Sequence, residues 1–247
     1  MGATKIEFRL RMLIMVAIVC LGFWAPWIEV WGFGTRIPLM EWLPLELARL
    51  GLVPFAVAAP VVIVLASLVA AVGAVLRVWG TAYLGYGTVH HEQMQAGAVM
   101  ADGPYRYLRN PLYEGGWCMF AAMAFLMPPS GALVSMTLVT VFFLRLILAE
   151  EAFLSGQLGE PYREYLRAVP RLFPRLRAGL PSAGHNPHWL ISVISEINPI
   201  GIFFTLAVLS WTYNYWLMIQ GILVSLGASL VVRAFMKGKP AAGQQAA

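Results

Sequence analysis

Long apolar runs separated by polar connectors dominate the chain. A helix needs roughly 20 residues, at 1.5 Å each, to cross a hydrocarbon core of about 30 Å. Six candidate spans follow one another, at about residues 12–31, 52–78, 112–127, 133–149, 190–211 and 215–232. The third and fourth are short and form a hairpin around Pro128-Pro129-Ser130-Gly131. The pattern predicts an all-α, polytopic integral membrane protein with about six transmembrane helices, including a short helical hairpin.

The distribution of positive charge gives the orientation. With the N-terminus in the cytoplasm, all of the 17 Lys and Arg residues except Arg36 and Arg49 fall in cytoplasmic segments or helix ends. Membrane proteins carry such an excess of Lys and Arg on their cytoplasmic side. We therefore expect a multi-pass protein of the bacterial inner (plasma) membrane with both termini in the cytoplasm.

The composition excludes most soluble classes of protein. Hydrophobic residues make up 60% of the chain and charged residues 12%, and the mean hydropathy is +0.71. A soluble domain averages about 25% charged residues, so this chain has too few charged residues to cover a surface that faces water on all sides. Cys20 and Cys118 both lie in apolar runs and are too few for a disulfide framework. The partner predicted is the membrane with its lipids, whereas no nucleic acid is expected and no protein partner is indicated.

Two long polar connectors, about residues 81–110 and 150–187, flank the short hairpin on the cytoplasmic side. Because the hairpin brings its two ends together, we expect the connectors to meet in space and to carry any chemistry. In the second connector, apolar residues recur at near-helical spacing from Phe153 to Leu166, which predicts a cytoplasmic amphipathic helix on the membrane. Gly159 and Pro161 divide it into two shorter pieces.

The end of the first connector has the features of an anion site. Asn110 and Pro111 suit the N-cap and the first position of the helix that follows. Free N–H groups at that helix start, beside Arg106 and Arg109, favour a carboxylate or a phosphate. For Arg106 alone, a capped transmembrane helix with cytoplasmic arginines is the better explanation.

Charged residues also mark the end of the hairpin. Arg145 can snorkel, pair across the hairpin with Glu114, or hold the carboxylate of a ligand. Glu150 and Glu151 oppose the macrodipole at a helix C-terminus, so they either bind a ligand or form a solvated helix end. No histidine or cysteine spacing matches a metal-ligand pattern, so no metal site is expected.

The combined pattern resembles the integral-membrane methyltransferases typified by isoprenylcysteine carboxyl methyltransferase and phosphatidylethanolamine N-methyltransferase. Their motif is similar to G-x-Y-x-x-x-R-H-P-x-Y-x-G, followed by E-E-x-x-L and F-G-x-x-Y-x-x-Y-x-x-x-V-P. The matching residues are Gly103, Tyr105, Arg109, Pro111, Tyr113, Gly115, Glu150, Glu151, Leu154, Gly159, Tyr162, Tyr165, Val169 and Pro170. Asn110 stands where the family has histidine.

The resemblance implies a methyltransferase that uses S-adenosylmethionine and takes a lipophilic acceptor from the bilayer, either an isoprenylcysteine-type carboxylate or a lipid head group. Its cofactor residues would be Gly103, Tyr105, Arg109, Asn110, Pro111, Tyr113, Glu150 and Glu151. Arg145 or Arg171 would position an acceptor carboxylate, and Glu151 would take the proton from an acceptor amine.

The resemblance also divides the chain. Residues 1–64 would form N-terminal transmembrane helices, residues 65–177 the catalytic core with the cofactor pocket, and residues 178–247 a C-terminal helix pair with a flexible tail. Two other classes stay open. Membrane sterol and steroid reductases have a similar architecture but use NADPH, and a lipid-binding relative without catalysis is the third reading.

Overall fold

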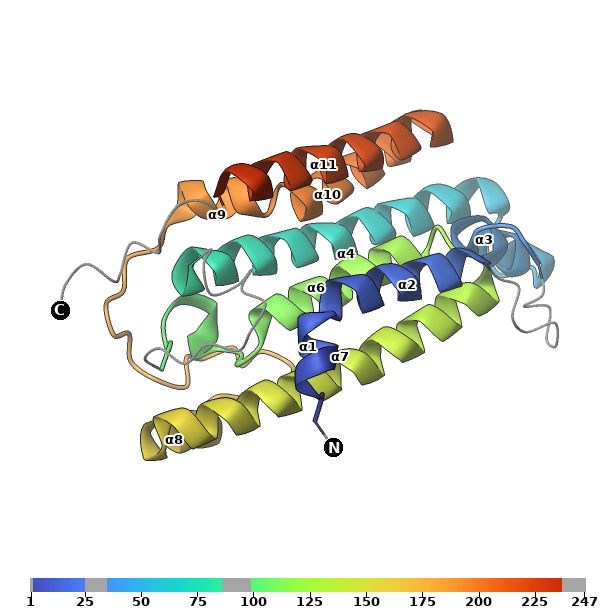
Figure 1. Cartoon of the computed structure of the whole chain (residues 1–247). Helices are drawn as coiled ribbons and strands as arrows, with labels where there is room; N and C mark the ends of the chain where they lie inside the picture. Colours follow the sequence, from blue (N-terminus) through green and yellow to red (C-terminus); the bar gives the residue numbers. More distant parts are fainter. Residues whose placement is uncertain (1, 25–34, 86–98, 237–247) are drawn as a thin grey trace.

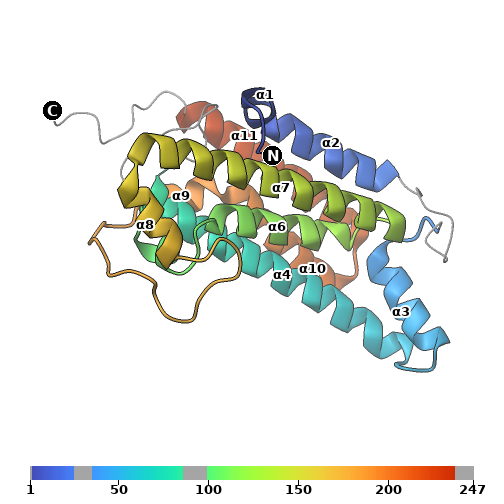
Figure 2. The same cartoon turned by 90° about the horizontal axis from the view of Figure 1, so that it is seen from below.

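The computed structural model describes residues 2–24, 35–85 and 99–236, and the regular elements in this part of the chain are all helices, without a β-strand. Most of the helices run side by side in one elongated bundle (Figures 1 and 2). In chain order the elements are α1 (Lys5–Arg9), α2 (Arg11–Trp24), α3 (Leu39–Arg49), α4 (Phe55–Leu84), the 3₁₀ turn η2 (Gly103–Arg106), α6 (Pro111–Ala124), α7 (Pro129–Leu158), α8 (Glu160–Ala168), α9 (Trp189–Ser195), α10 (Ile197–Thr212) and α11 (Tyr215–Met236).

Three of these helices, α4, α7 and α11, are long and apolar enough to cross a membrane. The α9–α10 pair, bent by 66° at its break, makes a fourth span if it is counted as one. The predicted count of about six spans is therefore not confirmed. Both α2 and α6 have 14 residues, which is about 21 Å of helix and shorter than the hydrocarbon core. The end of the predicted first span, residues 25–31, lies outside the described residues.

Small residues let the central helices approach closely. A Cβ atom at Gly73 in α4 would lie 2.8 Å from the carbonyl oxygen of Gly115 in α6, so this crossing needs glycine. Ala70 and Ala122 are fully buried at the same α4–α6 contact, and Leu206 brings α10 into this core. Helix α6 of the hairpin thereby packs closely against α4, whereas α7 packs against α6 and α2. The predicted boundary at residues 64–65 falls inside α4, and the division of the chain stays a prediction.

The hairpin turn lies slightly earlier than predicted. Pro128 is the N-cap of α7 and Pro129 its first residue, so Ser130 and Gly131 already belong to the helix. Proline suits this position because its missing N–H has no partner in the first turn anyway. At the other end α7 continues as far as Leu158, well past the predicted residue 149.

The break between α7 and α8 falls where the sequence predicts it. Gly159 has a φ of +64°, a left-handed conformation that glycine adopts without strain, and Pro161 follows in the first turn of α8. Tyr162 and Tyr165 of α8 pack against the protein, in a cluster with Val99 and other apolar residues. The placement of α8 on a membrane surface stays a prediction.

Candidate functional site

The two connectors meet at one end of the bundle, as the sequence predicts. Backbone N–H groups of Arg109, Arg175 and Gly179 donate to the carbonyl oxygens of Pro170, Tyr107 and Arg106, at 2.9, 3.1 and 2.8 Å. These bonds join residues 106–109 to residues 170–179, beyond α8. The site is therefore built on two chain segments that backbone hydrogen bonds join at the end of the α6–α7 hairpin (Figure 1).

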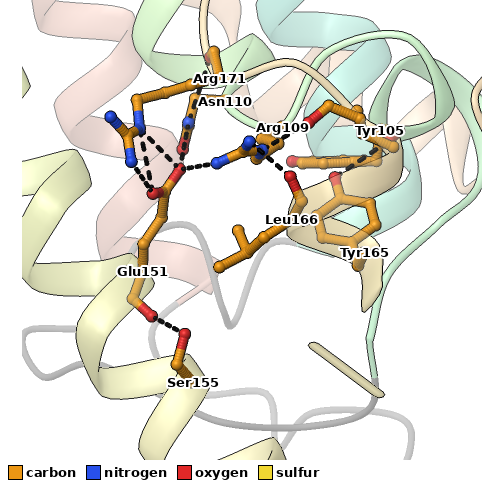
Figure 3. A network of polar contacts seen from close by, with 9 residues as sticks. Tyr105, Arg109, Asn110, Glu151, Ser155, Tyr165, Leu166 and Arg171 are labelled. Carbon is orange, nitrogen blue, oxygen red and sulfur yellow. Dashed lines mark hydrogen bonds and ion pairs between the residues drawn. The ribbon is translucent and has the colours of Figure 1, made fainter. Parts of the chain in front are cut away.

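Glu151 lies at the centre of this site (Figure 3). Its side chain is 8% exposed, and its carboxylate accepts hydrogen bonds from Arg171 Nη2 at 2.7 Å and from Arg109 Nη1 at 3.1 Å. A buried carboxylate is costly unless it is paired and hydrogen-bonded. Glu151 is thus not part of a solvated helix end, because two arginines, one from each connector, neutralise its carboxylate.

Arg109 links this carboxylate to the end of α8. Its Nε donates to the carbonyl oxygen of Val169 at 2.5 Å, and its Nη2 to that of Leu166 at 2.6 Å. These carbonyls belong to the last turn of α8 and the residue after it, where a helix leaves acceptors unpaired and favours a cation. One guanidinium therefore holds both the C-terminus of α8 and the C-terminal part of α7.

Asn110 occupies the N-cap position of α6, as predicted, but its side chain does not cap the helix. Its Nδ2 points to the carbonyl oxygen of Arg171 at 3.3 Å and to Glu151 Oε1 at 3.5 Å. The side chain thus donates to acceptors distant in the sequence instead of accepting from an N–H of the first turn of α6. Pro111 begins α6 as predicted and is buried.

Tyr113 and Glu150 form the second link between α6 and α7. The Tyr113 hydroxyl donates to Glu150 Oε2 at 3.0 Å, and its ring packs edge-on against Phe143 with the ring centroids 5.6 Å apart. The two adjacent glutamates therefore have different partners, since Glu150 binds a neutral hydroxyl and Glu151 binds two arginines.

Gly103 and Tyr105 form the turn that precedes this network. Gly103 has a φ of +54°, and a Cβ atom there would lie 2.3 Å from the Tyr83 ring, so the position needs glycine. Tyr105 is 7% exposed, and its hydroxyl has no hydrogen-bond partner within the described part of the chain. Burial raises the pKa of Tyr105 well above its usual range, so this hydroxyl stays protonated and keeps a proton to donate.

Arg145 is not brought into the network. Its Nη2 donates to both carboxylate oxygens of Glu7 in α1, each at 2.9 Å, and its carbonyl oxygen accepts from the N–H of Ala3. Of the three predicted alternatives, an ion pair is the one found, but the partner is Glu7 rather than Glu114. The proposed role of Arg145 in positioning an acceptor has no support from this contact.

The sequence interpretation missed the ion pair between Arg77 and Glu196. Arg77 Nε and Nη2 donate to the two oxygens of Glu196 at 2.6 and 3.0 Å, and the Thr81 hydroxyl donates to the same carboxylate at 2.8 Å. Glu196 is 1% exposed and lies at the break between α9 and α10. The signal was present, because a charged residue within an apolar span calls for a partner.

A second missed cluster surrounds Asp102, directly before Gly103. Its buried carboxylate accepts from the Ser182 hydroxyl at 2.5 Å, from the backbone N–H groups of Ala183 and His185, and from His185 Nδ1 at 2.6 Å. Burial by itself raises the pKa of Asp102, but these hydrogen bonds outweigh it and hold the pKa below its usual range. The carboxylate fastens residues 182–185 to the first connector.

No group of three or more His, Cys, Asp or Glu side chains that could hold a metal ion occurs in residues 2–24, 35–85 and 99–236. The sequence neighbours His90, His91 and Glu92 lie outside the described residues.

A comparison with known families indicates the class of protein. Residues 61–160 match the phospholipid methyltransferase family. The match confirms the resemblance read from the motifs, and it includes most of α4, η2, α6 and α7. It supports a methyltransferase role, and together with the apolar helices it supports an integral membrane protein. No curated protein and no solved structure matches the chain.

The family match ends before one of the residues of this network. Arg109, Asn110, Glu150 and Glu151 lie inside residues 61–160, whereas Arg171 lies outside them. The contact of Arg171 with Glu151 therefore brings a residue from beyond the matched segment into the centre of the site.

Proposed function

We propose that the protein is an S-adenosylmethionine-dependent methyltransferase that acts on a lipophilic acceptor at the cytoplasmic face of a bacterial inner membrane. The family match supports the methyltransferase class. The observation that carries the location of the site is the contact of Arg109 with Glu151, which joins the start of the hairpin to its end at 3.1 Å. The acceptor is an isoprenylcysteine-type carboxylate or a lipid head group, reached from the bilayer.

The residues at this end of the bundle fit the chemistry of the cofactor. S-adenosylmethionine carries a carboxylate, an ammonium group, ribose hydroxyls and a positively charged sulfur. The Arg171 side chain is 42% exposed and can bind a carboxylate, while Glu150 and Glu151 are acceptors for hydroxyl or ammonium groups. The unpartnered Tyr105 hydroxyl is a buried donor beside the same turn.

In this proposal Gly103, Pro111 and Tyr113 shape the turn around the cofactor, and Arg109 and Asn110 hold Glu151 in place. The cofactor supplies an electrophilic methyl group, and the protein aligns the acceptor and excludes water, which contributes several kcal/mol through proximity alone.

The base for an acceptor amine is better assigned to Glu150 than to Glu151. Both oxygens of Glu151 already accept from arginines, whereas Glu150 accepts from the neutral hydroxyl of Tyr113. An acceptor carboxylate needs no base, only a cation to position it, and Arg171 is the predicted cation that lies at this site.

Thermal unfolding of the detergent-purified protein with added ligands tests the proposal. S-adenosylhomocysteine at about 100 times its Kd should stabilise the fold by about 2.7 kcal/mol, which appears as a higher melting temperature. Stabilisation by NADP instead would assign the chain to the reductase class. No response to either ligand would favour a lipid-binding relative without catalysis.

A further inference from the structure

Residues 170–178, here called the 170–178 loop, expose two large apolar side chains. Phe173 is 83% exposed and Leu176 is 101% exposed. Both lie in the long segment between α8 and α9, at the end of the bundle that carries the connectors (Figures 1 and 2). Exposing such side chains to water costs free energy, whereas an apolar phase at this end of the bundle would bury them.

The loop is held in this shape rather than free to collapse. The carbonyl oxygen of Pro170 accepts from Arg109, the N–H of Arg175 donates to Tyr107, and the N–H of Gly179 donates to Arg106. Phe173 has a φ of +56°, a left-handed conformation that an aromatic residue adopts only where the surrounding structure imposes it. The two apolar side chains are therefore presented outward by a fastened backbone.

The charges of the loop complement an anionic surface. Arg171 turns inward to Glu151, but Arg175 and Arg177 are exposed and alternate with the apolar pair. Apolar side chains interleaved with arginines are the composition that binds a membrane interface with anionic lipid, because the apolar groups enter the acyl boundary and the cations meet the phosphates.

The apolar exposure continues towards the membrane-crossing part of the chain. The segment that follows the loop leads to α9, where Trp189 is 48% exposed and Leu190 is 75% exposed. The α9–α10 pair is itself a candidate span, and tryptophan is typical of the membrane–water interface. The loop and the start of α9 thus place exposed apolar groups at the same end of the bundle.

We propose that the 170–178 loop docks onto the cytoplasmic leaflet of the membrane, with Phe173 and Leu176 at the acyl boundary and Arg175 and Arg177 on the phosphates of anionic phospholipids. This surface is separate from the hydrogen bonds that build the Glu151 network, and the inference does not rest on the methyltransferase proposal.

The test is the depth of a fluorescent label on the loop. Leu176→Cys, in a background in which Cys20 and Cys118 are replaced by alanine, is labelled with an environment-sensitive dye and placed singly in nanodiscs. The discs contain phosphatidylcholine alone or equal parts of phosphatidylcholine and phosphatidylglycerol. We expect a blue-shifted emission in the anionic discs, quenching by lipids with a nitroxide on the acyl chain, and protection from iodide in the water.

Two control variants separate docking from a general effect of the label. A dye at Asn186→Cys, an exposed position in the same connector, should stay accessible to iodide in both kinds of disc. Replacing Arg175 and Arg177 by glutamine should lower the docking equilibrium constant of the loop, read from the Leu176→Cys label, by about fivefold for each charge removed.

A label at position 176 that iodide reaches freely in anionic discs, without quenching by the nitroxide lipids, would overturn the proposal and place the loop in water. Protection that appears only when discs hold two copies would overturn it as well, because the surface would then be a contact between protein chains. Docking that is equal with and without phosphatidylglycerol would contradict the assigned role of the two arginines.

Discussion

Two buried carboxylates of this protein are built alike but placed differently. Glu151 and Glu196 have side chains that are 8% and 1% exposed. Glu196 accepts two hydrogen bonds from Arg77, and Glu151 accepts three from Arg171. Arg77 and Thr81, which both donate to Glu196, lie one turn apart on α4. The partners of Glu151 come from two connectors and include Arg171, which is 42% exposed.

The difference is our reason for proposing the Glu151 network, and not the Arg77–Glu196 pair, as the functional site. Arg77 is 22% exposed and holds the break between α9 and α10 against one rigid helix, so this pair fixes helix positions. Arg171 sits on a loop and is partly open to its surroundings, so its guanidinium can exchange one partner for a ligand at little structural cost. A buried ion pair alone does not mark a functional site. The origin and the exposure of its partners do.

The largest expected effect on stability comes from Glu196→Gln. The substitution leaves the partly buried Arg77 cation without its counter-charge, and the loss of one partner of a fully buried pair, about 3–5 kcal/mol, is the upper bound for this cost. We expect a loss of up to this size in the free energy of unfolding, measured in mild detergent. Glu46→Gln is the matched control, because the pair of Glu46 with Arg49 is exposed and such pairs contribute about 1 kcal/mol or less. Equal losses in the two variants would contradict the structural role assigned to Glu196.

Glu151→Gln should affect ligand binding more than folding. The charge that anchors Arg109 and Arg171 is lost, but the packing of α4, α6 and α7 is unchanged. We expect the affinity for S-adenosylmethionine to fall by at least about 100-fold, or roughly 2.7 kcal/mol, in calorimetry, with the helical circular dichroism signal retained. Glu160→Gln, which removes a half-exposed carboxylate on α8, is the control. Wild-type affinity in Glu151→Gln would refute the pocket.

The sequence could predict the parts of this comparison that local patterns encode. Gly159 and Pro161 mark the break before α8, and the resemblance assigns Arg109 and Glu151 to one cofactor pocket. The pairing of Arg77 with Glu196 could not be predicted from the sequence. The two residues are 119 positions apart, and only the packing of α9 on α4 brings them together. The prediction for the Asn110 side chain failed for the same reason. The side chain donates to Glu151 and to the Arg171 carbonyl oxygen, which lie far away in the sequence, and it does not cap α6.

The smallest expected effect belongs to Glu7, the partner of Arg145, and it depends on pH. The hydrogen bond with the Thr4 backbone, followed by the hydrogen bond from Arg145, lowers the pKa of Glu7 to about 2 from its ordinary 4.5. A folded-state pKa below the unfolded value means that the contribution to stability is complete above about pH 4.5. It is then lost as the pH falls from 4.5 through 2.

Glu7→Gln should therefore lower the melting temperature slightly at pH 6 and leave it unchanged relative to the wild type near pH 2.5, where most of the contribution is gone. Arg145→Gln should show the same pattern, with unchanged affinity for S-adenosylmethionine, because Arg145 meets Glu7 rather than the Glu151 network. A loss of cofactor affinity in Arg145→Gln without any loss in Glu7→Gln would return Arg145 to the site.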